Sequence, residues 1–166
     1  DRIEEFGAIM RLVRDLNRSI VAVWCDEQRG RWTAPRGSID VWWRSGRNGP
    51  LMLLLAHLLS QNPEWRDRRI RVLHVAESEE ERERAQRELA EVVASARIQA
   101  WTRVFVSKDV AETIHKHSRR AAVVLFGFHP PAEGQEREML ERLTRFMEGL
   151  NDVILVSNAG DVSLEA

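Results

Sequence analysis

One loop of this sequence carries residue types that bind anions. It lies between a short apolar run and a leucine-rich segment beginning at Pro50, and its candidate ligands are Arg44, Arg47, Asn48 and Gly49. Guanidinium groups pair with phosphate, and the free N–H groups of a helix that begins near Pro50 would add to the attraction. The loop has only a Gly-x-x-Gly pattern and neither of the glycine-rich nucleotide signatures. A tight turn with solvated arginines is therefore the preferred interpretation, and a phosphate site is the alternative.

A second loop is expected beside the first. The segment 127–131 reads Gly-Phe-His-Pro-Pro and ends another apolar run. In an open α/β sheet, ligands bind beyond the carboxyl ends of the strands, at the point where the strand order reverses. His129 is therefore a further candidate ligand. The alternative is that the two prolines only end the strand and direct the chain toward the next helix.

The other reactive side chains suggest neither a catalytic centre nor a metal site. His115 and His117 are two residues apart, so on a helix they point about 200° apart and cannot share one ion. Neither the H-E-x-x-H nor the G-x-S-x-G pattern occurs. Cys25 ends an apolar run without a nearby base and is expected to be a small buried residue. We therefore predict a protein that is not an enzyme, with no metal and no required cofactor.

Asp40 stands out because it lies inside an apolar run that contains Trp42 and Trp43. Burying a carboxylate in a strand is costly unless the group is paired. We expect Asp40 either to accept hydrogen bonds from neighbouring backbone groups or to pair with an arginine. A catalytic role for Asp40 has no support in the sequence.

Composition narrows the class of protein. The chain has 166 residues, with 25 basic and 26 acidic side chains and a formal net charge of -1. This balance argues against nucleic acid as a partner, because binding phosphates needs an excess of lysine and arginine. Hydrophobic residues make up 43% of the chain, which is typical of a folded domain and not of a disordered one. A single cysteine excludes an intramolecular disulfide.

Hydrophobic periodicity predicts alternating strands and helices. Expected helices cover 3–16, 50–60, 78–96, 109–117 and 136–148, and expected strands cover 19–25, 39–43, 69–75, 101–107, 121–128 and 153–157. Strands that alternate with helices imply parallel pairing and right-handed crossovers. The predicted fold class is therefore α/β: a three-layer, doubly wound, mainly parallel sheet with an extra helix and strand at the N-terminus.

The sequence leaves open to which domain the first 25 residues belong. Residues 39–166 form the predicted α/β domain, 26–38 are a loop, and 1–25 are the extra helix and strand. The segment 11–23 echoes 145–157 at an offset of 134 residues, with Leu16 matching Leu150 and Ile20 matching Ile154. Either the echo is chance or shared turn chemistry, or residues 1–25 end a preceding, similar subdomain.

Several segments together resemble one protein family. They read I-D-V-W-W at 39–43, N-G-P-L-M-L-L at 48–54, Trp65, R-I-R-V at 69–72, A-S-A-R-I-Q-A at 94–100, A-V-V-L at 122–125, H-P-P at 129–131 and V-I-L-V at 153–156. They resemble the cytoplasmic C-terminal domain of the cation–chloride cotransporters, sodium/potassium/chloride symporters of the amino acid–polyamine–organocation superfamily. Gly49-Pro50 departs from the family's Gly-Gly, and the short connection 106–117 suggests a prokaryotic type without kinase-controlled regulation.

The resemblance implies a fold similar to universal stress proteins and a non-catalytic regulatory role. It further implies a homodimer, a covalently linked transmembrane transport domain that this chain does not contain, and a place at the cytoplasmic face of the cell membrane. The alternative function is a nucleotide sensor of the universal-stress type, with ATP between 44–50 and 127–131. Against it, the glycine motif usual in that family is missing here.

Overall fold

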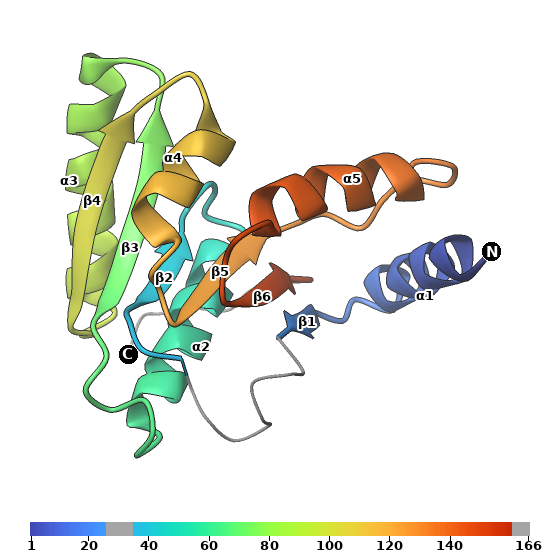
Figure 1. Cartoon of the computed structure of the whole chain (residues 1–166), viewed down its shortest axis with the longest axis horizontal. Helices are drawn as coiled ribbons and strands as arrows, with labels where there is room; N and C mark the ends of the chain where they lie inside the picture. The colour runs from blue at the N-terminus through green and yellow to red at the C-terminus, as the bar shows by residue number, and fades with distance from the viewer. Residues whose placement is uncertain (26–34, 161–166) are drawn as a thin grey trace.

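The structure, a computed structural model, describes residues 1–25 and 35–160. Within these ranges one six-stranded sheet has the strand order β1-β6-β5-β2-β3-β4 (Figure 1). The strands are β1 (Ile20–Trp24), β2 (Ile39–Trp42), β3 (Ile70–Ala76), β4 (Ala100–Val106), β5 (Val123–Gly127) and β6 (Asp152–Ser157). The helices are α1 (Arg2–Asp15), α2 (Gly49–Gln61), α3 (Glu79–Ser95), α4 (Val110–Ser118) and α5 (Glu136–Met147). No helix in the described residues is long and apolar enough to cross a lipid bilayer.

The predicted doubly wound topology is confirmed. The chain runs outward from β2 through β3 to β4, then returns to place β5 on the other side of β2, with β6 beyond it. These pairings are parallel, and the edge strand β1 is antiparallel to β6. The strand order therefore reverses between β2 and β5, which is where a doubly wound sheet opens a crevice.

Local sequence signals set the helix ends. The Ser78 side chain accepts a hydrogen bond from the Glu81 N–H, and the Asp109 side chain accepts one from the Glu112 N–H. Both are N-caps that satisfy a free donor of the first turn. Pro50 lies at the start of α2, where its missing N–H has no cost.

Successive side chains of the central strands point to opposite faces of the sheet and enter two separate hydrophobic cores. Helices cover both cores, so the molecule has three layers. Ile39 and Val41 pack with α2 and α3 on one face of the sheet. Trp42 packs with α4 and with residues of and after α5 on the other face. Because both faces are covered, β5 is apolar along its length, as expected of a central parallel strand.

The helix α1 lies at the end of the sheet farthest from α3 and β4, next to α5 (Figure 1). Met10 packs on Met139 and Leu143 of α5. Arg11 forms an ion pair with the buried Glu136, and this hydrogen bond lowers the pKa of the Glu136 carboxyl. A Cβ at position 7 would overlap the Glu136 side chain, so the close approach of the two helices requires glycine there.

One sequence-based expectation is corrected at this end of the molecule. Cys25, expected to be buried, is exposed, because it follows an edge strand that no further strand covers in the described residues. The residue alignment at an offset of 134 does not hold in the strands. Ile20 packs beneath α1 and α5, whereas Ile154 packs against the core on the opposite face. A shift of one residue in a strand moves every side chain to the other face, and the echo is off by such a shift.

The other edge of the sheet, β4, is capped by a side chain. The N–H of Ser107 donates to Ala76 in β3, so the even-numbered residues of β4 direct their backbone groups outward. The Gln86 amide of α3 covers two of these groups: it donates to the Thr102 carbonyl at 3.3 Å and accepts from the Val104 N–H at 3.1 Å. Native proteins commonly block an edge strand in such ways to prevent pairing with other chains.

Replacing Gln86 with alanine should therefore have two effects. The free energy of unfolding should fall by about 1 kcal/mol, since two backbone groups lose their partner but stay accessible to water. The uncovered edge should also promote association beyond that of the wild type at high concentration. Denaturant titration and sedimentation velocity measure the two effects, with the exposed Gln61→Ala as the control. Equal behaviour of the two variants would refute this role for Gln86.

Candidate functional site

The two loops predicted to meet at the crevice do meet, and Asn48 joins them. Its side chain is 4% exposed. The Nδ2 group donates to the Phe128 carbonyl at 3.2 Å, and Oδ1 accepts from the Asn158 N–H at 2.8 Å. The backbone partners fix the orientation of the amide, because a carbonyl can only accept and an N–H can only donate. Asn48 thus fastens together the chain segments that follow β2, β5 and β6.

Asn48 also fills the floor of the crevice. A Cβ added to Gly127 would lie 2.8 Å from Asn48 Nδ2, so the asparagine side chain rests directly on this glycine. Gly49 is equally enclosed, since a Cβ there would lie 2.5 Å from atoms of the Trp43 ring. Two of the predicted ligands, Asn48 and Gly49, are therefore packed into the protein.

Two other predicted ligands line an adjoining cavity of about 240 Å³. Arg47 and His129 lie there together with Arg14 and Arg18 from the end of α1 and the segment after it. Arg44 is exposed and is not part of the lining. The sequence analysis missed Arg14 and Arg18, because only the packing of α1 against α5 brings them to this place.

The chemistry of this cavity is that of a basic recess. Three arginines and a histidine line it, but Arg14 is ion-paired with Asp15 at 2.9 Å, and Arg47 already donates to the Asn158 carbonyl at 3.3 Å. The volume lies below the range of roughly 300–1,000 Å³ typical of small-molecule pockets. It therefore suits an anion of the size of phosphate better than a whole nucleotide.

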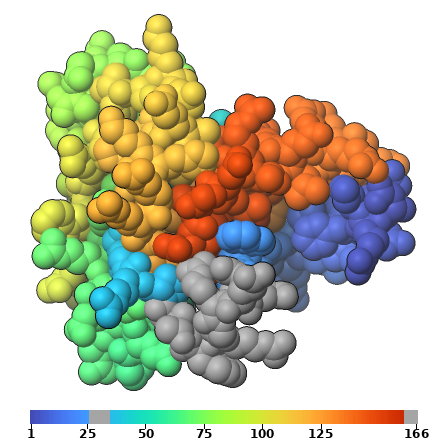
Figure 2. Space-filling model, viewed as in Figure 1, coloured from blue at the N-terminus to red at the C-terminus, as the bar shows by residue number. Residues whose placement is uncertain are grey.

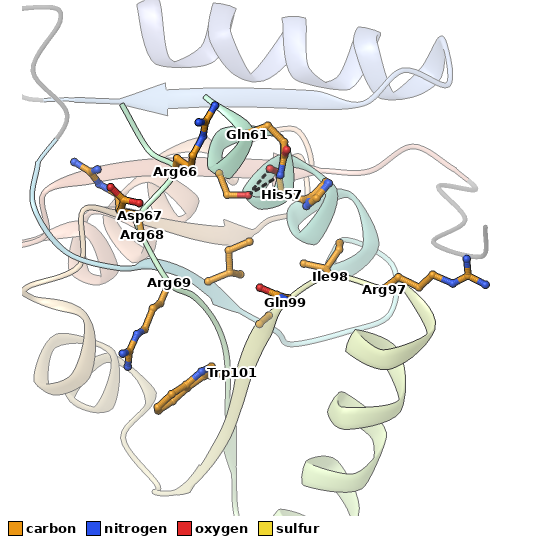
Figure 3. A pocket seen from close by; sticks show the side chains of 13 residues that line it. His57, Gln61, Arg66, Asp67, Arg68, Arg69, Arg97, Ile98, Gln99 and Trp101 are labelled. Atoms are coloured by element: carbon orange, nitrogen blue, oxygen red, sulfur yellow. Dashed lines mark hydrogen bonds between the residues drawn. The ribbon is translucent and has the colours of Figure 1, made fainter. Parts of the chain in front are cut away.

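A larger cavity, of about 900 Å³, lies at the amino ends of β3 and β4. Its side chains point in different directions: Arg69 lies beside Trp101, while Arg66 and Arg97 extend away from each other (Figure 3). The Arg69 guanidinium lies 4.8 Å from the centre of the Trp101 ring. Because α2 and α3 end at this cavity, its arginines lie near the negative ends of two helix dipoles. This arrangement explains the basic lining without a ligand.

The buried carboxylate Asp40 is paired with an arginine, as predicted. Asp40 is 0% exposed and accepts hydrogen bonds from Arg71 Nε at 2.7 Å and Arg71 Nη2 at 2.5 Å. The hydroxyls of Ser38 and Ser118 donate to the same carboxylate at 2.7 and 2.6 Å. The Ser118 hydroxyl also accepts from Trp42 Nε1 at 3.0 Å. The Asp40 carboxylate thus accepts four hydrogen bonds, two from Arg71 in β3, one from Ser118 in α4 and one from Ser38 just before β2. Its role is structural.

His117 lies beside this network. Its ring stacks on Phe105 with 3.9 Å between ring centres, and its carbonyl accepts from Arg71 Nη2. Burial lowers the pKa of His117, and the positive charges of Lys116, Arg103 and Arg71 lower it further. The imidazole is therefore neutral at pH 7, and the folded protein resists its protonation. No group of three histidine, cysteine or carboxylate side chains in the described residues is placed to hold a metal ion.

The lowered pKa of His117 predicts a loss of stability in mild acid. Its contribution is fully present above the ordinary histidine pKa of 6.5 and declines as the pH falls below that value, because the unfolded chain then takes up the proton more readily. Thermal unfolding between pH 8 and pH 5 measures this decline. In His117→Gln the decline should be smaller than in the wild type. An unchanged pH profile in that variant would contradict the assignment.

Comparison with known proteins identifies the family. Residues 22–126, more than half of the chain, match the family model for solute carrier family 12. The chain belongs to solute carrier family 12. Its structure is similar to the crystal structure of the cytoplasmic domain of a prokaryotic cation chloride cotransporter, with a TM-score of 0.68 and 20% sequence identity. The match covers 99% of this chain and 62% of that one. No curated protein matches the chain.

Membership of solute carrier family 12 confirms the resemblance found in the sequence. The matched segment runs from β1 to β5 and contains Asp40, Arg71 and Asn48. It includes neither α1 nor His129, which form much of the basic cavity. The part of this solute carrier family 12 member that matches the family model therefore includes the buried Asp40 and Asn48 but leaves out α1, α5 and β6.

Proposed function

We propose that this chain is a non-catalytic regulatory domain of a cation–chloride cotransporter and acts at the cytoplasmic face of the cell membrane. The family match over 22–126 carries the proposal, and the similarity to the fold of a cotransporter's cytoplasmic domain supports it. The site geometry agrees with such a role. The buried polar groups of Asp40 and Asn48 bond to other parts of the domain instead of converging on an open pocket. In this proposal the ion pathway belongs to a linked transmembrane domain.

Transport by the intact protein tests the regulatory role. A variant that destabilises this domain, such as Asp40→Ala, should reduce the maximal rate of ion uptake or the amount of assembled transporter. The ion concentration that gives half-maximal uptake should stay the same, because a regulatory domain does not bind the transported ions. A changed half-maximal concentration with an unchanged maximal rate would overturn the proposal. The exposed Asp67→Ala serves as the control.

We further propose that the domain forms a homodimer. Large apolar side chains are exposed at both ends of the molecule, among them Phe6, Leu16, Val23, Trp101 and Val110. Exposed apolar patches commonly mark protein interfaces. Sedimentation velocity of the intact transporter in detergent should give a dimer at micromolar concentration. A monomer at every concentration would refute this part of the proposal.

The basic cavity favours one alternative, a sensor that binds a nucleotide. We expect the domain to work without one, because Asn48 occupies the crevice floor between β2 and β5. Millimolar ATP should therefore leave the melting temperature unchanged. A ligand at 100 times its dissociation constant stabilises a protein by about 2.7 kcal/mol, so a rise of several degrees would favour the sensor. Tripolyphosphate in a parallel experiment distinguishes recognition of the phosphates from recognition of the base.

A further inference from the structure

We propose that a strip of alternating cations and aromatic rings along β4 binds the anionic phospholipids of the cytoplasmic leaflet of the membrane. The strip is made of Arg69, Trp101, Arg103, Phe105 and His117. The proposal rests on the proposed place of the domain at the cytoplasmic face of the membrane, and it adds a direct contact with the lipid surface. In Figure 2, which looks onto the face that carries α4 and α5, α4 lies next to the yellow residues of β4.

On its face of the sheet, the strip extends beyond the cover that the described helices provide. Gln86 of α3 donates to the Thr102 hydroxyl at 2.7 Å, so the even-numbered side chains of β4 point toward α3. Successive side chains of a strand point to opposite faces, and the odd-numbered ones therefore lie on the face of α4. The short helix α4 contacts Phe105 through its last turn. Trp101 and Arg103 stay exposed, Trp101 by 64%.

Contacts within the strip hold its cations in place. The Arg69 guanidinium lies 4.8 Å from the centre of the Trp101 ring, and the Arg103 guanidinium lies 5.1 Å from that of Phe105. The Phe105 ring stacks on His117 with 3.9 Å between ring centres. A guanidinium that lies over a ring can still direct its N–H groups past the ring edge to phosphate oxygens. The strip thus presents two positioned phosphate donors at the surface before any lipid binds.

The positive charge of the strip is not neutralised by ion pairs. Neither Arg69 nor Arg103 forms an ion pair among the described residues. Asp40, on the same face of the sheet, is buried and already paired with β3. Burial lowers the pKa of His117, and the charges of Lys116 and Arg103 lower it further, as expected where the local potential is positive. The cytoplasmic leaflet carries a negative surface potential, so the charges of the two surfaces are complementary.

Trp101 favours a lipid surface over other anionic partners. Tryptophan gathers at the membrane–water interface, where its apolar ring and its polar N–H are both accommodated. A peptide that adds a strand to the sheet is disfavoured, because Gln86 covers backbone groups at the edge of β4. A nucleic acid is disfavoured by the formal net charge of -1 of the whole chain. A membrane meets only one face of the domain, so its binding depends on the local charge of the strip.

Flotation with lipid vesicles tests the proposal. The 166-residue chain should float with vesicles made of equal amounts of phosphatidylserine and phosphatidylcholine, and not with phosphatidylcholine alone. Each cation at an anionic membrane surface raises the affinity about fivefold, so Arg103→Gln should weaken binding by that factor. Trp101→Ala should weaken it by as much or more, since the interface loses its exposed ring. Added salt should weaken the binding of the wild type.

Two control variants lie on the opposite face of the sheet. Arg87→Gln on α3 makes the same charge change as Arg103→Gln at another exposed arginine. Leu58→Ala on α2 removes an apolar side chain that is 56% exposed, against 64% for Trp101. Both control variants should bind the vesicles like the wild type. All four variants should melt near the temperature of the wild type, because exposed side chains contribute little to stability.

Four results would overturn the proposal. One is that the phosphatidylserine vesicles bind no chain at low salt. Another is that the control variants lose as much binding as the strip variants. The third is that Trp101→Ala dissociates a dimer in sedimentation velocity and leaves vesicle binding unchanged, because a second copy then covers the strip. The fourth is that polyglutamate binds as tightly as the vesicles, which indicates an acidic protein partner. None of these results bears on the regulatory role, which ion uptake by Asp40→Ala tests separately.

Discussion

Replacing Asp40 with alanine should lower the free energy of unfolding by about 3 kcal/mol. Removing one partner of a buried ion pair typically costs about 3–5 kcal/mol, and the lower end applies because Arg71 keeps some contact with water. The hydroxyls of Ser38 and Ser118 lose their acceptor as well. For a domain of this size the melting temperature should fall by roughly 6–12 °C. Thermal and denaturant unfolding measure both quantities.

The matched control for Asp40→Ala is Asp67→Ala. Asp67 is exposed, so its removal should change the stability by no more than about 0.5 kcal/mol. The double variant Asp40→Leu with Arg71→Met should be more stable than Asp40→Ala, since it leaves no buried charge unpaired. If Asp40→Ala proves as mild as Asp67→Ala, the network does not hold β2, β3 and α4 together in the way described above.

The second large effect is expected at Asn48. Asn48→Ala leaves the Phe128 carbonyl and the Asn158 N–H without their partner in a buried place. Each unsatisfied buried group costs about 1–3 kcal/mol, so the loss of both partners should lower the free energy of unfolding by about 2–6 kcal/mol. Denaturant titration followed by tryptophan fluorescence measures the loss. Asn62→Ala is the control, because the Asn62 side chain accepts one hydrogen bond at an exposed helix end.

A second substitution separates packing from hydrogen bonding at this position. Gly127→Ala alone should be strongly destabilising, since the new Cβ meets the Asn48 side chain. Combined with Asn48→Gly, which removes both Asn48 Nδ2 and Asn48 Cβ from the path of the new Cβ, it should cost much less, so that the two effects are not additive. Additive losses would show that Asn48 and Gly127 do not share the space assigned to them, and the crevice floor would then be open to a ligand.

The elements of the fold follow from local sequence signals. The capping residues Ser78 and Asp109 satisfy donors three residues ahead of them, so their helices begin where the sequence predicts. The apolar run that became β5 needs cover on both faces, and alternation of strands with helices provides it. The pairing of Asp40 was also predictable from its neighbours in the sequence, because a carboxylate buried in an apolar strand needs a hydrogen-bonding or charged partner.

The candidate site was only partly predictable. The sequence placed Arg47 and His129 at the same crevice, since the carboxyl ends of neighbouring parallel strands meet. In the alternative phosphate site Asn48 was a candidate ligand, but two backbone groups from distant segments occupy its side-chain amide. No local pattern reveals such a use, because the partners lie 80 and 110 residues further along the chain.

Local patterns in the amino-acid sequence were enough to locate the helices and strands, to identify their apolar faces and to relate the chain to its family. Hydrogen bonding within a helix turn and the periodicity of side chains act over a few residues, and a single chain displays both. Three features emerge only from the folded chain: β1 runs antiparallel at the edge of the sheet, Cys25 is exposed, and Arg14 and Arg18 lie beside Arg47. These features depend on which apolar surfaces are buried against one another when all helices and strands pack together. No residue pattern at a single position reveals that outcome.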